Sequence, residues 1–258
     1  MKTFHHGGRI VDLIFALWTM KHLGGGRLII SDYQKGNWDL DIGESMRSFL
    51  ELQPYIEEVR LTRYEAIQTI CPIDYDLHAA EDGIDVRFFP EYDREKYGWP
   101  GNINIIKLYC THFGLNDVYT KWLETREPWL VAPVAKERVD VAFHCPLRRS
   151  VRSREDWMHI LNDLWDEELL VAVLGREEIM ICKSRDLLES AGWINSAKVF
   201  LGTVSCCNAI AEGLGKTRFV EQAPDCFNVN VDPPSVSING MSNEEVVRRV
   251  LEVVRNES

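Results

Sequence analysis

Arginines are concentrated in one short stretch of this chain. The segment PLRRSVRSR, residues 146–154, places Arg148, Arg149, Arg152 and Arg154 within nine positions. Planar guanidinium groups match phosphate oxygens in pairs, so this stretch is a candidate phosphate-binding loop. It follows VDVAFH, which predicts a strand, and parallel sheets bind ligands where their strands end. The alternative interpretation is a solvated surface loop.

The turn in VFLGTVSCCNAIAEGLG, residues 199–215, is a second candidate for phosphate binding. Its apolar run predicts a strand, and the helix that follows would point N–H groups and its positive dipole end at the sheet edge. Gly202 would let a ligand approach the backbone of the turn, next to Val204. The hydroxyls of Thr203 and Ser205 would act as donors. A plain strand-to-helix turn explains the same residues without any ligand.

Carboxylates at other positions could take part in chemistry. Asp12 falls in the first turn of the helix predicted by IVDLIFALWTMKHLG. The helix dipole alone favours a carboxylate there, and a catalytic base would also suit that place. Glu221 ends the predicted strand RFVE and could hold ribose hydroxyls, as acidic strand-end residues do in nucleotide-binding folds; the alternative is a surface glutamate. Glu212, late in its helix, would face either a cleft or solvent.

Several well-known nucleotide-binding and metal-binding motifs are missing from the candidate segments. The loop HHGGR matches neither G-x-G-x-x-G nor G-x-x-x-x-G-K-[ST], and we expect His5 and His6 to be loop residues rather than bases. DYD at 74–76 has the spacing of a metal-dependent sugar transferase but follows no predicted nucleotide site. The seven cysteines form no C-x-x-C, which argues against a disulfide framework or a zinc site. No metal site is expected.

Composition indicates a globular protein of a reducing compartment. The chain has 258 residues, of which 45% are hydrophobic and 27% are charged. No apolar run is long enough to span a bilayer, and the start lacks a signal peptide, so we expect a cytoplasmic protein. The net charge of −11 argues against extended binding along a nucleic-acid backbone.

Hydrophobic periodicity predicts two α/β halves. A β-α-β unit opens the chain over residues 1–35, and a second alternation of strands and helices begins at 139. Between them, REPWLVAPVAKER at 126–138 has two prolines and no periodicity, which predicts a linker. The last helix, at 242–256, opens with a Ser-x-x-Glu capping box. We therefore predict an α/β fold with a doubly wound parallel sheet in each half.

Together these segments resemble the two-domain GT-B glycosyltransferases, and within them the heptosyltransferase family and its short phage and bacterial relatives. The resemblance covers most of the chain and is most specific in the strand, Gly-x-x-Ser turn, Ala-Glu-Gly-Leu helix and Glu-ending strand of the second half. It implies two Rossmann-like domains facing a cleft. We expect a first, acceptor-side domain at 1–130, a nucleotide-sugar-binding domain at 138–240, and a C-terminal helix at 241–258 that crosses back to the first domain.

The resemblance also implies roles in the first domain. In the family a Gly-Asp pair opens the first helix, and its Asp is the proposed base that deprotonates the acceptor hydroxyl. That role carries to Asp12, although Val11 stands here where the family has glycine. We place His6 beside Asp12 as a second catalytic candidate, and we assign Gly8 and Arg9 to the donor-binding residues.

In the second domain the resemblance implies a donor site. Basic residues after its first strand bind the donor diphosphate, and Arg148, Arg149 and Arg152 match that place. The turn at 202–205 would bind the same diphosphate, with Thr-Val-Ser here where relatives often have Asn-Gln-Ser. Glu221 would hold the donor ribose. Arginines and amides replace a metal, so the expected activity is a metal-independent glycosyltransferase with a nucleotide-diphospho-sugar as co-substrate and no cofactor.

Two rival functions stay open at this stage. A nucleotide-sugar epimerase uses the same fold and diphosphate site but needs further acid and base residues in the cleft. A non-catalytic scaffold would keep the fold and bind a nucleotide or a protein partner. The acceptor of a transferase is expected to be a saccharide or another small molecule.

Overall fold

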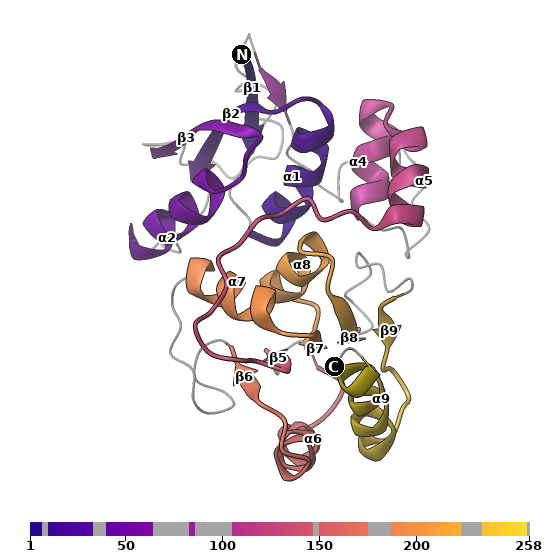
Figure 1. Cartoon of the computed structure of the whole chain (residues 1–258). Coiled ribbons are helices and arrows are strands. Elements are labelled where there is room, and N and C mark those ends of the chain that lie inside the picture. The colour runs from indigo at the N-terminus through magenta and orange to yellow at the C-terminus, as the bar shows by residue number, and fades with distance from the viewer. Residues whose placement is uncertain are drawn as a thin grey trace. The chain divides into compact units, whose positions relative to one another are not determined.

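The computed structural model contains two compact α/β units, which are shown with their element labels in Figure 1. The first unit comprises Met1–Trp99 and Ile105–Val131, and the second comprises Pro100–Asn104 and Ala132–Ser258. The residues that the structure describes are 1–6, 10–32, 40–63, 83–85, 105–146, 150–174, 187–222 and 234–256. The DYD segment at 74–76 lies outside them, as do Gly8, Arg9, Arg148 and Arg149.

The first unit is built on a parallel sheet with the strand order β3-β2-β1-β4. The strands are β1 (Lys2–His6), β2 (Gly26–Asp32), β3 (Ile56–Arg63) and β4 (Ile84–Asp85). The helices are α1 (Ile10–His22), α2 (Leu40–Glu51), α4 (Ile105–Phe113) and α5 (Asn116–Thr125). The expected loop at HHGGR is partly wrong, because His5 and His6 pair with Ile29 and Ile30 of β2 and belong to β1.

Helix α1 is the core element of this unit. All of its residues from Leu13 to Met20 are buried, which agrees with the helical spacing of its apolar side chains. Trp18 contacts two aromatic rings of α5, with centroids 6.3 Å from Tyr119 and 6.1 Å from Trp122. Helix α5 was not predicted, because only these two side chains of its largely polar sequence are buried.

The second unit carries a parallel sheet with the strand order β6-β5-β7-β8-β9. The strands are β5 (Val141–His144), β6 (Val171–Val173), β7 (Val199–Thr203), β8 (Thr217–Glu221) and β9 (Val236–Ser237). The helices are α6 (Arg154–Asp166), α7 (Leu187–Ser196), α8 (Cys206–Gly213) and α9 (Asn243–Asn256). The predicted alternation of strands and helices is confirmed, while the short strand β9 was not anticipated.

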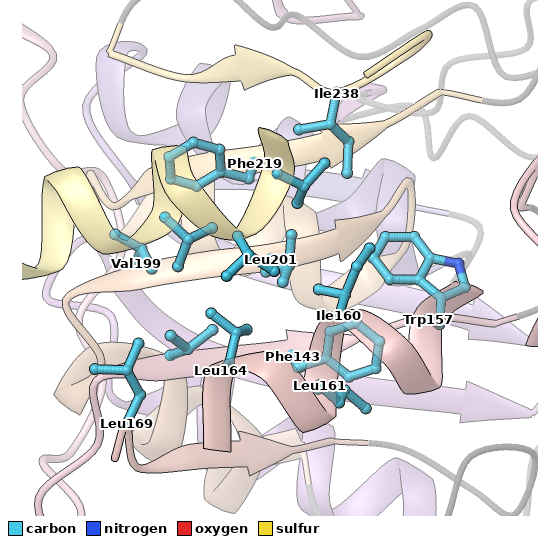
Figure 2. Packing of buried hydrophobic residues seen from close by; sticks show 14 of the residues in the cluster. Phe143, Trp157, Ile160, Leu161, Leu164, Leu169, Val199, Leu201, Phe219 and Ile238 are labelled. Atoms are coloured by element: carbon cyan, nitrogen blue, oxygen red, sulfur yellow. The ribbon is translucent and has the colours of Figure 1, made fainter. Parts of the chain in front are cut away.

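One core of the second unit lies between its sheet and the helices α6 and α9. Figure 2 shows Trp157 and Ile160 of α6 over Phe143 and Leu201 of the sheet. The buried face of α9 joins the same cluster through Val246, Val247, Val250 and Val254. We expected the last helix to cross back to the first domain. The structure shows its apolar stripe buried against α6 and the second sheet, and the crossing stays a prediction.

The segment expected to be a linker is anchored on both sides of the boundary between the units. In the first unit Trp129 Nε1 donates to the Ile14 carbonyl at 3.2 Å, and the Gln53 amide forms hydrogen bonds with both main-chain groups of Val131, at 2.8 and 2.9 Å. In the second, Asn195 Nδ2 donates to the Ala132 carbonyl at 2.8 Å. The prolines exclude regular structure here, but side chains satisfy the backbone instead.

Within the described ranges no helix combines the length and the apolar character that a bilayer crossing needs. The cysteines of these ranges, Cys110, Cys145, Cys206 and Cys207, are free thiols.

Candidate functional site

The carboxyl ends of three neighbouring strands bring the predicted ligand-binding segments together in the second unit. His144 of β5 pairs with Gly202 of β7, and Thr203 of β7 pairs with Glu221 of β8. The turn before α8 and the loop after β5 therefore begin at the same sheet edge. In a doubly wound sheet this edge is where ligands bind.

Gly202 is required by the close approach of β5. A methyl group on Gly202 would lie 1.9 Å from the carbonyl oxygen of His144, which is backbone and cannot move aside. We expected this glycine to admit a ligand to the turn. The structure gives it a different and sufficient reason, which is the spacing between two strands of the sheet.

The hydroxyls of the turn are directed into the protein. Ser205 is the N-cap of α8, and its Oγ accepts a hydrogen bond from Asn208 N at 3.3 Å. The same Oγ lies 2.9 Å from His144 Nδ1. Thr203 is fully buried, and its hydroxyl has no hydrogen-bond partner within the described part of the chain. The expected hydroxyl donors thus face inward, which leaves the first N–H groups of α8 as the donors that a helix start offers.

His144 is a site residue that the sequence did not reveal. It ends β5, and burial lowers its pKa to about 4, so the imidazole is neutral at pH 7. A neutral imidazole can share one hydrogen bond with Ser205 and adds no charge to this edge. The only available signal was a histidine at the end of an apolar run.

Arg152 forms several hydrogen bonds within the protein. Its Nη1 donates to Glu221 Oε1 at 2.7 Å, and its Nη2 donates to the carbonyls of Ile238 and Met241 at 3.1 and 2.7 Å. The guanidinium also lies 5.6 Å from the ring centre of Trp157. We expected Arg152 to bind phosphate. In the structure its donors serve to join the loop after β5 to β8 and to the segment before α9.

Glu221 is equally engaged. The residue is 1% exposed. Its Oε2 accepts hydrogen bonds from Ser150 Oγ at 2.5 Å and from Val151 N at 2.9 Å. We expected a carboxylate open to a ribose, but its oxygens point at the loop after β5. A sequence cannot show this pairing, because the partners are about 70 positions apart.

A cavity of about 310 Å³ opens beside this ion pair. Asp156, in the first turn of α6, lies at its wall, and hydrogen bonds from Asn243 and Ser153 lower the pKa of its carboxyl. The residues lining the cavity are Val151, Arg152, Asp156, Glu221, Asn239, Gly240, Met241 and Asn243. The cavity is therefore lined by both polar and apolar residues and lies at the starts of α6 and α9.

A second buried ion pair lies between α8 and β8. Glu212 Oε2 is 2.9 Å from Arg218 Nη1, and both side chains are 3% exposed. Arg218 also donates to Asn208 Oδ1 at 3.1 Å and to Ser235 Oγ at 3.1 Å. Glu212 was expected to face a cleft or solvent, and it does neither. An arginine inside the apolar strand TRFVE was the overlooked signal.

The candidate catalytic residues lie in the first unit. Asp12 is half-buried in the first turn of α1, as predicted. His6 is the last residue of β1 and is 2% exposed. The start of α1 thus follows the end of a central strand, which is where a catalytic carboxylate of this fold type was expected. In the described ranges no group of three or more His, Cys, Asp or Glu side chains is placed to hold a metal ion.

The fold is that of two-domain glycosyltransferases. No family model and no curated protein matches the sequence. Among solved structures, the E. coli heptosyltransferase WaaC with ADP-2-deoxy-2-fluoro heptose matches with a TM-score of 0.57 and 10% identity, over 98% of this chain and 99% of that chain. A glycosyl transferase family 9 protein from Veillonella parvula matches with a TM-score of 0.55 and 10% identity, over 100% and 98%.

A third solved structure is matched over only part of its own length. The iron-containing dodecameric glycosyltransferase TibC from enterotoxigenic E. coli matches with a TM-score of 0.53 and 12% identity, over 99% of this chain and 76% of that chain. At these identities the likeness is one of fold. The chain has the GT-B fold of these proteins, which confirms the predicted α/β class.

Proposed function

We propose that this protein is a glycosyltransferase that moves a sugar from a nucleotide-diphospho-sugar to an acceptor hydroxyl. One observation carries the proposal. The helix start and the arginine-bearing loop share one sheet edge, in a chain whose fold is matched over 98% of its length by a heptosyltransferase solved with an ADP-sugar analogue. An ADP-linked sugar is therefore the first donor to test.

On the donor side, the leaving diphosphate would be bound by the N-terminal N–H groups of α8 and by Arg148 and Arg149. Charge develops on the diphosphate as its bond to the anomeric carbon breaks, and these donors would stabilise it. Amides and arginines then take the place of a metal, so we propose a metal-independent reaction. The turn at 202–205 contributes its backbone, because the Thr203 and Ser205 side chains face inward.

On the acceptor side, Asp12 is the proposed general base. The acceptor oxygen would form its bond to the anomeric carbon as Asp12 takes the hydroxyl proton and the nucleoside diphosphate departs. His6 precedes Asp12 in the sequence and is proposed as a second catalytic residue, whereas Gly8 and Arg9 are proposed to bind the donor. The net charge of −11 favours a saccharide or another small acceptor over a nucleic-acid backbone, and we place the reaction in the cytoplasm.

The donor can be tested by thermal shift with nucleoside diphosphates and their sugars. A ligand that binds only the folded protein raises the melting temperature. We expect a rise with one nucleotide class, and we expect the Arg148→Ala/Arg149→Ala double variant to lose it. No rise with any nucleotide would contradict the proposal.

Catalysis can be tested with Asp12→Asn. We expect donor binding to survive and sugar transfer to fall by about 100-fold or more, because the base is lost. Asp117→Asn is the matched control, since Asp117 is an exposed carboxylate in the first turn of α5. Equal transfer by both variants would refute the role of Asp12. Conversion of the nucleotide-sugar without any acceptor would instead indicate an epimerase.

A further inference from the structure

The donors that surround the Glu221 carboxylate all belong to three consecutive residues. Ser150 Oγ, Val151 N, Arg152 N and Arg152 Nη1 donate to it at 2.5, 2.9, 3.2 and 2.7 Å. These residues lie in the loop between β5 and α6. A single carboxylate at the end of β8 therefore holds a whole loop segment.

The loop segment is held from its other side as well. Trp157 Nε1 donates to Ser150 Oγ at 2.7 Å, and the Ser150 hydroxyl has two acceptors, Glu221 Oε2 at 2.5 Å and the Arg152 carbonyl at 3.0 Å. The guanidinium of Arg152 reaches past Glu221 to the carbonyls of Ile238 and Met241. The network joins the loop to β8, to α6 and to the segment between β9 and α9, so it fixes the position of residues 150–152 on the sheet.

We infer that Glu221 is a positioning residue that holds residues 150–152 at the sheet edge, and that it does not bind the donor ribose. The inference rests on the proposed function, in which the donor binds at this edge. Ribose hydroxyls could take the carboxylate only by displacing the protein donors. The buried Arg152 guanidinium would then lose its counter-charge, which is strongly unfavourable.

The sheet register shows why this position matters for a donor. Glu221 pairs with Thr203, so the carboxylate lies one strand away from the turn that precedes α8. β5 lies on the other side of β7, so the contacts of residues 150–152 with Glu221 place them two strands away from β5. The Glu221 carboxylate thus holds residues 150–152 at the sheet edge where β7 ends and α8 begins.

Trypsin cleavage tests the holding role without any nucleotide. Glu221→Gln keeps the side-chain size and removes the charge, and Glu252→Gln makes the same change at an exposed position of α9. We expect cleavage after Arg148, Arg149 or Arg152 to become about tenfold faster in E221Q, because weaker charge-assisted bonds raise the open population that the protease attacks. E252Q should match the unaltered protein. Equal rates in folded E221Q would overturn the inference.

Nucleotide binding separates positioning from ribose recognition. Calorimetric titration of ADP and of 2′,3′-dideoxy-ADP gives the loss of affinity for each probe. We expect E221Q to weaken both by the same factor, because the ribose hydroxyls are not its partners. A loss confined to ADP would overturn the inference. If the unaltered protein binds neither probe, the proposed ADP donor fails, while the trypsin result still decides the role of Glu221.

Folding is checked by circular dichroism and urea titration. Ser150→Ala replaces E221Q in the cleavage experiment if E221Q does not fold, because it keeps the Arg152–Glu221 ion pair and removes one hydrogen-bond donor to Glu221. We expect faster cleavage in S150A than in E252Q, by a smaller factor than in E221Q. An S150A protein that is cleaved like E252Q would overturn the inference.

Discussion

The turn before α8 and the loop after β5 reach the same sheet edge, but they are held there in different ways. The turn is fixed by its own sequence, since Gly202 allows β5 to approach and Ser205 caps the helix. The loop is fixed from outside, by Glu221 and by the carbonyls of Ile238 and Met241. The glycine and the capping serine that the turn needs therefore lie within its own segment, while the loop depends on residues far along the chain.

The largest effect should come from breaking the turn. We expect Gly202→Ala to reduce the free energy of unfolding by about 4 kcal/mol, because the new methyl group meets the His144 backbone. Gly240→Ala is the control, because Gly240 also has a positive φ, of 75°, but no atom lies within 4 Å of the added Cβ. It should cost only about 1 kcal/mol. Similar losses in urea titrations would refute the steric explanation.

The next largest effect should come from breaking the loop. Arg152→Met leaves the Glu221 carboxylate buried without its cation, and we expect a loss of about 3 kcal/mol in unfolding free energy. Arg249→Met is the control, since Arg249 is paired with Glu245 at a half-buried position of α9, where its side chain is 43% exposed, and should change little. A stable R152M protein would mean that the loop does not depend on this ion pair.

His144, which contacts the turn before α8 and precedes the loop after β5, should make the free energy of unfolding depend on pH. The folded-state pKa of His144 lies near 4, below its ordinary value of 6.5, so the unfolded chain binds the proton first as the pH falls. This contribution to stability is present above pH 6.5 and decreases as the pH falls towards 4. Between pH 7 and pH 5 it should lower the unfolding free energy by about 2 kcal/mol. Urea titrations should show a weaker pH dependence in His144→Gln, and identical pH profiles would contradict the burial of a neutral imidazole.

The smallest effect should come from the helix caps. Ser205→Ala at α8 and Ser153→Ala at α6 each remove a side-chain N-cap, and each should cost about 1 kcal/mol in urea titrations. A much larger loss at Ser205 alone would show that the bond to His144, rather than the cap, fixes the turn.

Local patterns account for what the sequence predicted correctly. The apolar spacing of α1, α6 and α9 and the strand-to-helix change at Ser205 each depend on residues within a few positions of one another. The same rules failed for α5, where only Tyr119 and Trp122 are buried, and for β9, which has two residues. Periodicity needs several buried positions before it can indicate an element.

The partners of the site residues could not be predicted for a different reason. The types and approximate places of Arg152 and Glu221 were recognised, but a free arginine and a free glutamate were expected where the two neutralise each other. The anchoring of Trp129 and Val131 was missed in the same way, because a proline-containing segment gives no sign of the side chains that will bond to it. Contacts between distant residues leave no local trace in one sequence.

The pairing of Arg152 with Glu221 also restricts how such a chain can change over generations. Replacement of either residue alone leaves a buried charge, so a single substitution has to pass through a destabilised protein. Descendants should therefore keep both residues or exchange both together, along with the serine at 150. An alignment of close relatives would show these three columns varying as a group, while the exposed arginines of α9 drift independently.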